Sequence, residues 1–228
     1  MIQHIPGPAG ILEALVDDPR SLCTTAGPPS RAPESETGSG AARVETPTAA
    51  VVLAHPHPQY GGTMHTKVVF QAAKAFCRLG CAVLRFNFRG VGVSDGEYSG
   101  GEGELADFRA GLDFMAARFP GVPLWAAGVS FGSWVAMTAG VEDARVTTLV
   151  GIAVPAALYD FSAVRASSTP KFFIHGEHDG ICPLRAVWDL YGKSSEPKEL
   201  VVVDGADHLF DGHVSEVADA IADLLAPA

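Results

Sequence analysis

The stretch PLWAAGVSFGSWVA, residues 123–136, decides the fold. Its first five residues form an apolar, strand-like run, and the sequence from Phe131 onward is typical of a helix. Gly128 and Gly132 flank Ser130, and glycines at these positions let the strand and the helix approach closely. A serine between a strand and a helix in this way is held in a strained conformation that exposes its hydroxyl. The stretch therefore predicts a sheet with Ser130 at its ligand-binding edge.

The same alternation of apolar runs and helical stretches continues through most of the chain. It predicts an α/β fold with a doubly wound, mostly parallel sheet flanked by helices, because strands buried on both faces are short and nearly all apolar. The link between residues 153 and 171 is short, so we expect no cap domain. The predicted strands are residues 10–16 (an edge strand), 50–54, 82–86, 123–127, 148–153, 171–174 and 200–203. The predicted helices are residues 63–79, 102–118, 131–139, 183–191 and 213–225.

Length and composition limit the organisation of the chain. With 228 residues, 47% of them hydrophobic, residues 1–228 can form a single domain. A stretch rich in Pro, Gly and Ser at about residues 24–48 predicts a surface loop. The four cysteines form no Cys-x-x-Cys pair and are expected to be free buried thiols.

Charge and hydropathy exclude several classes of partner. The net charge of −10 disfavours nucleic acids and anionic membranes, since both require a basic surface. The sequence contains no apolar run long enough for a membrane helix and no signal-peptide pattern at its start. We therefore expect a cytoplasmic protein, a monomer or homodimer, with a small molecule as its partner.

A base and an acid follow Ser130 at the ends of later predicted strands. Asp179 comes after the strand 171–174, and His208 comes after the strand 200–203. In this order the histidine can take the serine proton, while the acid orients the imidazole. Glu177 and Asp207 are rival acids, but Glu177 lies earlier in its turn and Asp207 adjoins the base.

Other histidines provide weaker alternatives. His213 could be the base, but it lies where the last helix is predicted to begin. A metal site would need ligands from the set His55, His57, His65, His175, His178 and Asp179. Their spacing does not match the helical pattern of zinc hydrolases, so we expect no metal and no cofactor.

An acyl substrate would also require donors for its oxyanion and a pocket. The amide of Phe131, directly after the serine, is one candidate donor. Prolines have no N–H, so in the loop after residue 54 the candidate is the amide of His57, with Gln59 as the fallback. The expected pocket residues are Tyr60, Met64, Trp134, Tyr159, Phe161 and Phe210.

These motifs together resemble the α/β-hydrolase superfamily, specifically the small cap-less bacterial serine hydrolases related to dienelactone hydrolases, prolyl-oligopeptidase catalytic domains and esterases. The resemblance covers residues 50–210. It implies a triad of Ser130, Asp179 and His208, with oxyanion donors at His57 and Phe131. It is carried by His55-Pro56-His57-Pro58 with Gly61-Gly62, by residues 87–94, by the turn around Ser130, by residues 175–179 and by Asp207-His208.

The chain also departs from these relatives. Dienelactone hydrolases carry a cysteine where this chain has Ser130, and the propeller of the peptidases is missing. We therefore expect a serine hydrolase that cleaves small acyl esters through an acyl-enzyme, in the manner of a carboxylesterase. A thioesterase, lactonase, peptidase or acyltransferase could use the same triad, and a non-catalytic binding protein on this scaffold is the alternative from another class.

Overall fold

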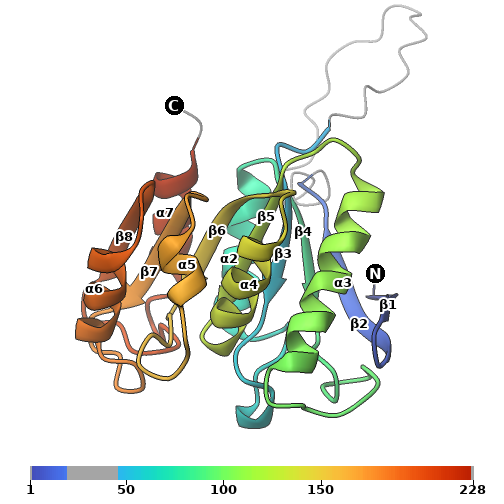
Figure 1. Cartoon of the computed structure of the whole chain (residues 1–228), viewed down its shortest axis with the longest axis horizontal. Coiled ribbons are helices and arrows are strands. Elements are labelled where there is room, and N and C mark those ends of the chain that lie inside the picture. The colour runs from blue at the N-terminus through green and yellow to red at the C-terminus, as the bar shows by residue number, and fades with distance from the viewer. Residues whose placement is uncertain (1, 20–45, 227–228) are drawn as a thin grey trace, which may run out of the picture.

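The computed structural model describes residues 2–19 and 46–226. All the described strands form one sheet with the order β1-β2-β4-β3-β5-β6-β7-β8 (Figure 1). Strands β3 to β8 run parallel, whereas β2 is antiparallel to β1 and β4. The strands are β1 (Ile2–Gly7), β2 (Gly10–Asp17), β3 (Ala50–Ala54), β4 (Ala82–Phe86), β5 (Leu124–Val129), β6 (Val146–Ile152), β7 (Lys171–Gly176) and β8 (Lys198–Val203).

Helices cover both faces of the sheet. Helices α2 and α7 pack on one face, and α3, α4, α5 and α6 pack on the other, each side with its own buried apolar cluster. Central strands β3 and β4 are buried along their whole length, as a sheet covered on both faces requires. The helical elements are η2 (Pro58–Tyr60), α2 (Lys67–Arg78), α3 (Glu102–Arg118), α4 (Phe131–Glu142), α5 (Ser162–Ala166), α6 (Leu184–Lys193) and α7 (Val214–Leu225).

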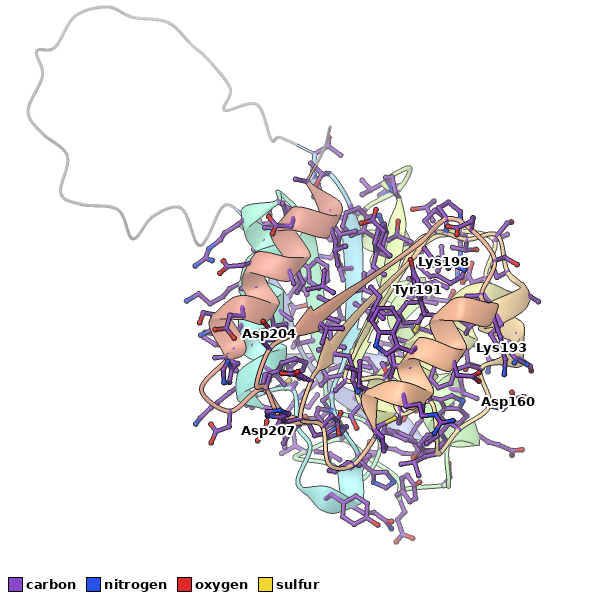
Figure 2. The ribbon with its side chains drawn as sticks, turned by 90° about the vertical axis from the view of Figure 1, so that its left-hand side faces the viewer. Asp160, Tyr191, Lys193, Lys198, Asp204 and Asp207 are labelled. Carbon is purple, nitrogen blue, oxygen red and sulfur yellow. The ribbon has the colours of Figure 1, made fainter. Side chains whose placement is uncertain are left out.

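The predicted fold class is confirmed. The connection from β6 to β7, described throughout, contains only the five-residue helix α5, so no cap covers the sheet edge there. At the far edge, α6 lies over β8, and the Lys198 ammonium sits 5.0 Å from the centre of the Tyr191 ring (Figure 2). Among the described helices, none combines the length and apolar character needed to cross a bilayer.

Several local predictions were wrong. The strand at residues 10–16 is not an edge strand, because β1 pairs with its outer side through a tight hairpin. Strand β1 and helix α5 were not predicted, since each is short and only partly apolar. Helix α2 begins four residues later than expected, because Thr63 and Thr66 close a turn in front of it. Most of the predicted loop at 24–48 lies outside the described residues.

Candidate active site

Ser130 occupies the sharp turn between β5 and α4. Its backbone has φ 53° and ψ −124°, a conformation that few non-glycine residues adopt. The Ser130 amide donates to the carbonyl of Ile152 on β6 at 2.8 Å, which fixes the turn against the neighbouring strand. A Cβ atom at Gly128 would lie 2.1 Å from the carbonyl oxygen of Gly132. The two glycines are therefore required by packing.

Gly132→Ala is expected to destabilise the protein by about 1–3 kcal/mol, the usual cost of forcing an added methyl group into a packed interior. The new Cβ would lie 2.4 Å from the His55 carbonyl oxygen and 2.7 Å from that of Ala54, so the end of β3 would have to move. Urea unfolding measures the loss. Gly192→Ala is the control, because its Cβ meets open space in a helix, and a larger effect there than at Gly132 would contradict the argument.

Ser130, His208 and Asp179 form a continuous hydrogen-bonded chain. The Ser130 Oγ lies 2.7 Å from His208 Nε2, and His208 Nδ1 lies 2.7 Å from Asp179 Oδ2. A carboxylate only accepts, so Nδ1 carries the imidazole proton and Nε2 accepts from the serine hydroxyl. All three residues are buried, with at most 9% of their surface exposed.

The carboxylate of Asp179 is held in its ionised form. Burial raises its pKa, but hydrogen bonds from His208, Cys182 and Ile181 outweigh burial and bring the pKa below its ordinary value. The amides of Ile181 and Cys182 both donate to Oδ1, at 2.9 and 2.8 Å, which leaves Oδ2 for the imidazole. The loop after β7 thus positions both oxygens.

His175 contacts the loop after β7 that carries Asp179. Its Nε2 donates to the Cys182 carbonyl oxygen at 2.8 Å and lies 3.3 Å from Asp179 Oδ2. The ring is fully buried, and burial lowers its pKa, so the imidazole is neutral at physiological pH. These contacts place His175 as a support of the loop that carries Asp179.

The rival side chains make other contacts. Glu177 accepts from the amide of Gly205, and Asp207 accepts from the amides of Leu209 and Asp211. His213 is the residue that precedes α7, and its Nδ1 lies 2.6 Å from Glu216 Oε2. Of the candidate acids and bases, the structure brings only Asp179 and His208 together with Ser130.

The candidate oxyanion donors come from two separate segments, the start of α4 and the loop after β3. Phe131 is the first residue of α4, where a helix leaves its amides without an internal acceptor. The His57 ring packs against the Phe131 ring, with centroids 4.8 Å apart, so the two donor residues are in contact. The Gln59 amide already donates to His57 Nδ1 at 3.2 Å, which makes Gln59 a poor fallback donor.

Two histidines fasten the loop after β3 to the loop after β4. His55 is fully buried, and its Nε2 accepts from the Phe88 amide at 3.1 Å. Burial lowers its pKa to about 4, so the ring stays neutral and its Nδ1 donates to the Pro56 carbonyl oxygen at 2.6 Å. His57 Nε2 lies 3.2 Å from the hydroxyl of Tyr98. Sequence reasoning missed Tyr98, which no motif marks.

The loop after β4 is itself firmly anchored. Glu13 on β2 accepts from the Asn87 side chain at 2.7 Å and from the Val93 amide at 3.1 Å. Asn87 in turn accepts from the Met64 amide at 2.8 Å. Arg89 pairs with both carboxylate oxygens of the buried Asp107. Through Asn87, the hairpin of β1 and β2 therefore supports the loop after β3, which carries His57 and Met64.

A cavity of about 650 Å³ opens beside Ser130, and we call it the serine pocket. Apolar side chains form most of its rim, and several of them are exposed: Tyr60 (86%), Leu158 (61%), Ile181 (59%) and Leu209 (43%). It is lined by Pro56, His57, Tyr60, Ser130, Phe131, Pro155, Leu158, Tyr159, Ile181, His208 and Leu209.

Four of the expected pocket residues do not line this cavity. Met64, Phe161 and Phe210 are buried in the core, and Trp134 stacks on Tyr159 with centroids 4.7 Å apart. Loops turn the side chains of Met64, Phe161 and Phe210 inward, which the sequence pattern did not reveal. Tyr60 and Tyr159 do line it. Leu158, Ile181 and Leu209 were missed, although each follows a strand end, where ligand-binding residues gather.

The histidines considered as metal ligands are dispersed. His65 and His178 are exposed, whereas His55 and His175 are buried and bonded to the backbone. Within residues 2–19 and 46–226, the structure brings no three His, Cys, Asp or Glu side chains into an arrangement that could hold a metal ion.

Comparisons with known proteins identify the family of the chain. Residues 45–164, more than half of the chain, match the family model described as serine aminopeptidase, S33. An uncharacterized protein of Rickettsia prowazekii is 35% identical over 203 residues, which cover 85% of each chain.

Two solved structures are similar over almost the whole chain. A Xanthomonas campestris α/β serine hydrolase without a lid is 32% identical, with a TM-score of 0.81, and the match covers 98% of this chain and 92% of that one. An α/β serine hydrolase homologue from Coxiella burnetii is 30% identical, with a TM-score of 0.83 over 99% and 97% of the two chains. This chain therefore belongs to the serine aminopeptidase S33 family, within the α/β-hydrolase superfamily of serine hydrolases.

Proposed function

We propose that this hydrolase cleaves small acyl esters through an acyl-enzyme intermediate, with Ser130 as nucleophile, His208 as general base and acid, and Asp179 as the orienting acid. The observation that carries the proposal is the chain of two 2.7 Å hydrogen bonds from Ser130 through His208 to Asp179 at the floor of an apolar pocket. A serine hydroxyl becomes an effective nucleophile only beside such a base.

The first half of the reaction forms the acyl-enzyme. Ser130 Oγ attacks the ester carbonyl carbon while its proton passes to His208 Nε2, and Asp179 stabilises the resulting imidazolium. The amides of Phe131 and His57 are the proposed donors to the oxyanion. When the tetrahedral intermediate collapses, His208 gives the proton to the departing alcohol oxygen.

In the second half of the reaction, water is the attacking group and Ser130 is the leaving group. His208 accepts a proton from water, the hydroxide attacks the acyl carbon, and the bond from carbon to Oγ breaks. The proton then returns from His208 to Ser130 Oγ, which releases a carboxylic acid. Because the connection from β6 to β7 forms no cap over the sheet edge, we expect the pocket to admit small substrates that diffuse in freely.

A burst experiment tests the proposal. Mixing the protein with p-nitrophenyl acetate is expected to release close to one equivalent of p-nitrophenol per chain before the slower steady state, because an acyl-enzyme accumulates. Parallel assays with thioesters, lactones and peptides rank the ester activity against the other reactions. A folded protein that neither turns over any ester nor reacts with a fluorophosphonate would contradict the proposal.

A further inference from the structure

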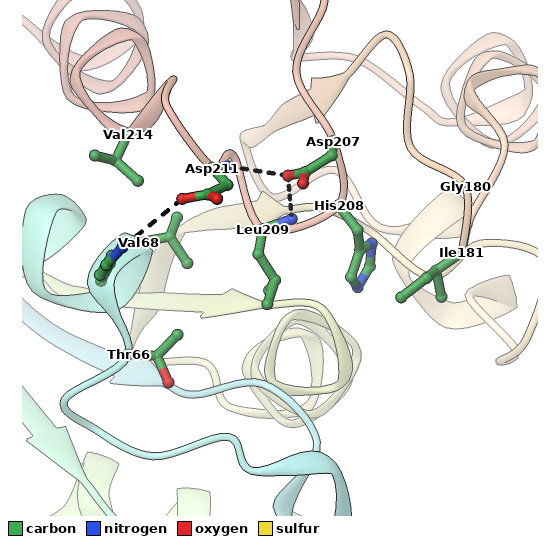
Figure 3. Close-up of a pocket in the computed structure, with 10 residues that line it drawn as sticks. Thr66, Val68, Gly180, Ile181, Asp207, His208, Leu209, Asp211 and Val214 are labelled. Carbon is green, nitrogen blue, oxygen red and sulfur yellow. Dashed lines mark hydrogen bonds and ion pairs between the residues drawn. The ribbon is translucent and has the colours of Figure 1, made fainter.

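The site continues past His208 into a second cavity, of about 540 Å³. We call it the histidine pocket, and its far walls are Thr66 and Val68 on one side and Asp211 and Val214 on the other (Figure 3). It shares three residues with the serine pocket: Ile181, His208 and Leu209. Of the proposed triad, His208 is among the described residues that line this pocket, whereas Ser130 is not.

From this division we infer that the serine pocket holds the acyl group of the substrate and that the histidine pocket holds the alcohol that leaves. The inference rests on the proposed function. The acyl group stays bonded to Ser130 Oγ through both halves of the reaction, so it must occupy the cavity that Ser130 lines. The alcohol oxygen must meet His208 Nε2 to receive its proton, and the alcohol then departs.

The position of the oxyanion donors agrees with this assignment. His57 and Phe131 both line the serine pocket, so the carbonyl oxygen of the substrate points to that side of His208. The fourth substituent of the tetrahedral carbon is the leaving group. The leaving group must therefore point past His208, where Ile181 and Leu209 line both pockets. This direction leads into the histidine pocket.

The lining of the histidine pocket indicates the class of alcohol. Val68, Val214 and Leu209 provide apolar surface, which favours an alcohol with an apolar body. The ionisable groups at its edge are Lys67, Asp207 and Asp211 together with His208, and the Lys67 ammonium lies 3.7 Å from the Asp211 carboxylate.

These charges do not favour an anionic leaving group. The edge carries one ammonium and two carboxylates, and one of the Asp207 oxygens already accepts from the amides of Leu209 and Asp211. A phosphorylated or carboxylated alcohol would meet excess negative charge there. The preferred substrate is therefore an ester of an uncharged, largely apolar alcohol.

Paired substitutions at Val214 test the assignment through the two rate constants of the reaction. Val214 is half-buried at the start of α7. It lines the histidine pocket but not the serine pocket. Val214→Phe narrows this pocket, and Val214→Ala enlarges it. Acylation and deacylation are measured by stopped flow with acetate esters of alcohols of increasing size, from methanol to naphthol.

With Val214→Phe we expect the preference for the bulky alcohol in acylation to fall by about tenfold or more, since one methylene group in an apolar pocket changes specificity by roughly 10–200-fold. Val214→Ala is expected to shift the preference in the opposite direction. Both variants should deacylate at the parental rate, because the alcohol has left before that step. Val214→Ala keeps the test valid if the phenylalanine variant does not fold.

Leu158 provides the matched comparison on the acyl side. Leu158 is exposed, and it lines the serine pocket but not the histidine pocket. Leu158→Phe and Leu158→Ala are expected to change the dependence on acyl chain length in both acylation and deacylation, and to leave the alcohol preference as in the parent.

Three results would overturn the inference. The first is a change in deacylation rate, or in acyl-length preference, in the Val214 variants. The second is an alcohol preference that moves with Leu158. The third is faster acylation by the acetate ester of p-hydroxybenzoate, which carries a negative charge, than by that of p-cresol, after correction for leaving-group pKa. Failure of the proposed function looks different, because the parent protein would then show no burst with any ester.

Discussion

Ser130→Ala is expected to lower kcat for p-nitrophenyl acetate by about 10⁶-fold, the scale found when the nucleophile of a serine triad is removed. Alanine cannot form the bond from Oγ to the acyl carbon, so only the oxyanion donors and the pocket remain to assist attack by water. Steady-state kinetics measure the loss, and reaction with a fluorophosphonate should disappear with it.

The substitution is a sensitive test because it changes little else. Ser130 holds its turn through its backbone amide, and the glycines at 128 and 132 set the packing around it. Alanine differs from serine only by the missing hydroxyl and can adopt the same backbone conformation. The folded state is therefore expected to persist. Ser215→Ala, at an exposed position of α7, is the matched serine control and should retain full activity. Full activity in Ser130→Ala would refute Ser130 as nucleophile.

Asp179→Asn is expected to lower kcat by about 10⁴-fold at neutral pH, as a triad acid does when its amide imposes the wrong imidazole tautomer. The amides of Ile181 and Cys182 both donate to Oδ1, so the asparagine oxygen must take that place. Its NH₂ group then faces His208 Nδ1 and forces that nitrogen to accept. The proton moves to Nε2, which can no longer accept from Ser130.

Asp160→Asn is the control for this change. Asp160 also accepts a backbone amide two residues ahead, that of Ser162, but it lies on an exposed loop. The pH profile of kcat separates an effect on the tautomer from simple unfolding, and urea unfolding of both variants should give similar midpoints. A loss of less than tenfold in Asp179→Asn would show that Asp179 does not orient His208.

The sequence was sufficient to predict the parts of this protein that depend on local pattern. Buried parallel strands are short apolar runs, and Ser130, Asp179 and His208 each follow such a run. Because parallel strands end at the same edge of a sheet, the convergence of the three residues could be inferred from their positions after these runs. The rival acid Glu177 could be ranked lower from its position in the same turn.

The remaining features depend on side-chain direction and on contacts between distant segments. Phe210 and Leu209 are adjacent in the sequence, yet the backbone at Phe210, with φ 57°, turns its ring into the core and leaves Leu209 at the pocket. The contact between His57 and Tyr98 joins loops 41 residues apart. Periodicity carries no information on either point.

The contacts of the buried Glu13 carboxylate limit how far the N-terminus of this protein can be shortened. The region shared with the family model begins at residue 45, but Glu13 supplies the acceptor for Asn87 and Val93, and Asn87 holds the backbone of Met64. A version of the protein trimmed to the shared region would leave these donors without partners inside the fold. The loops around Ser130 are thus held in part by the β1–β2 hairpin, which lies outside the region matched by the family model.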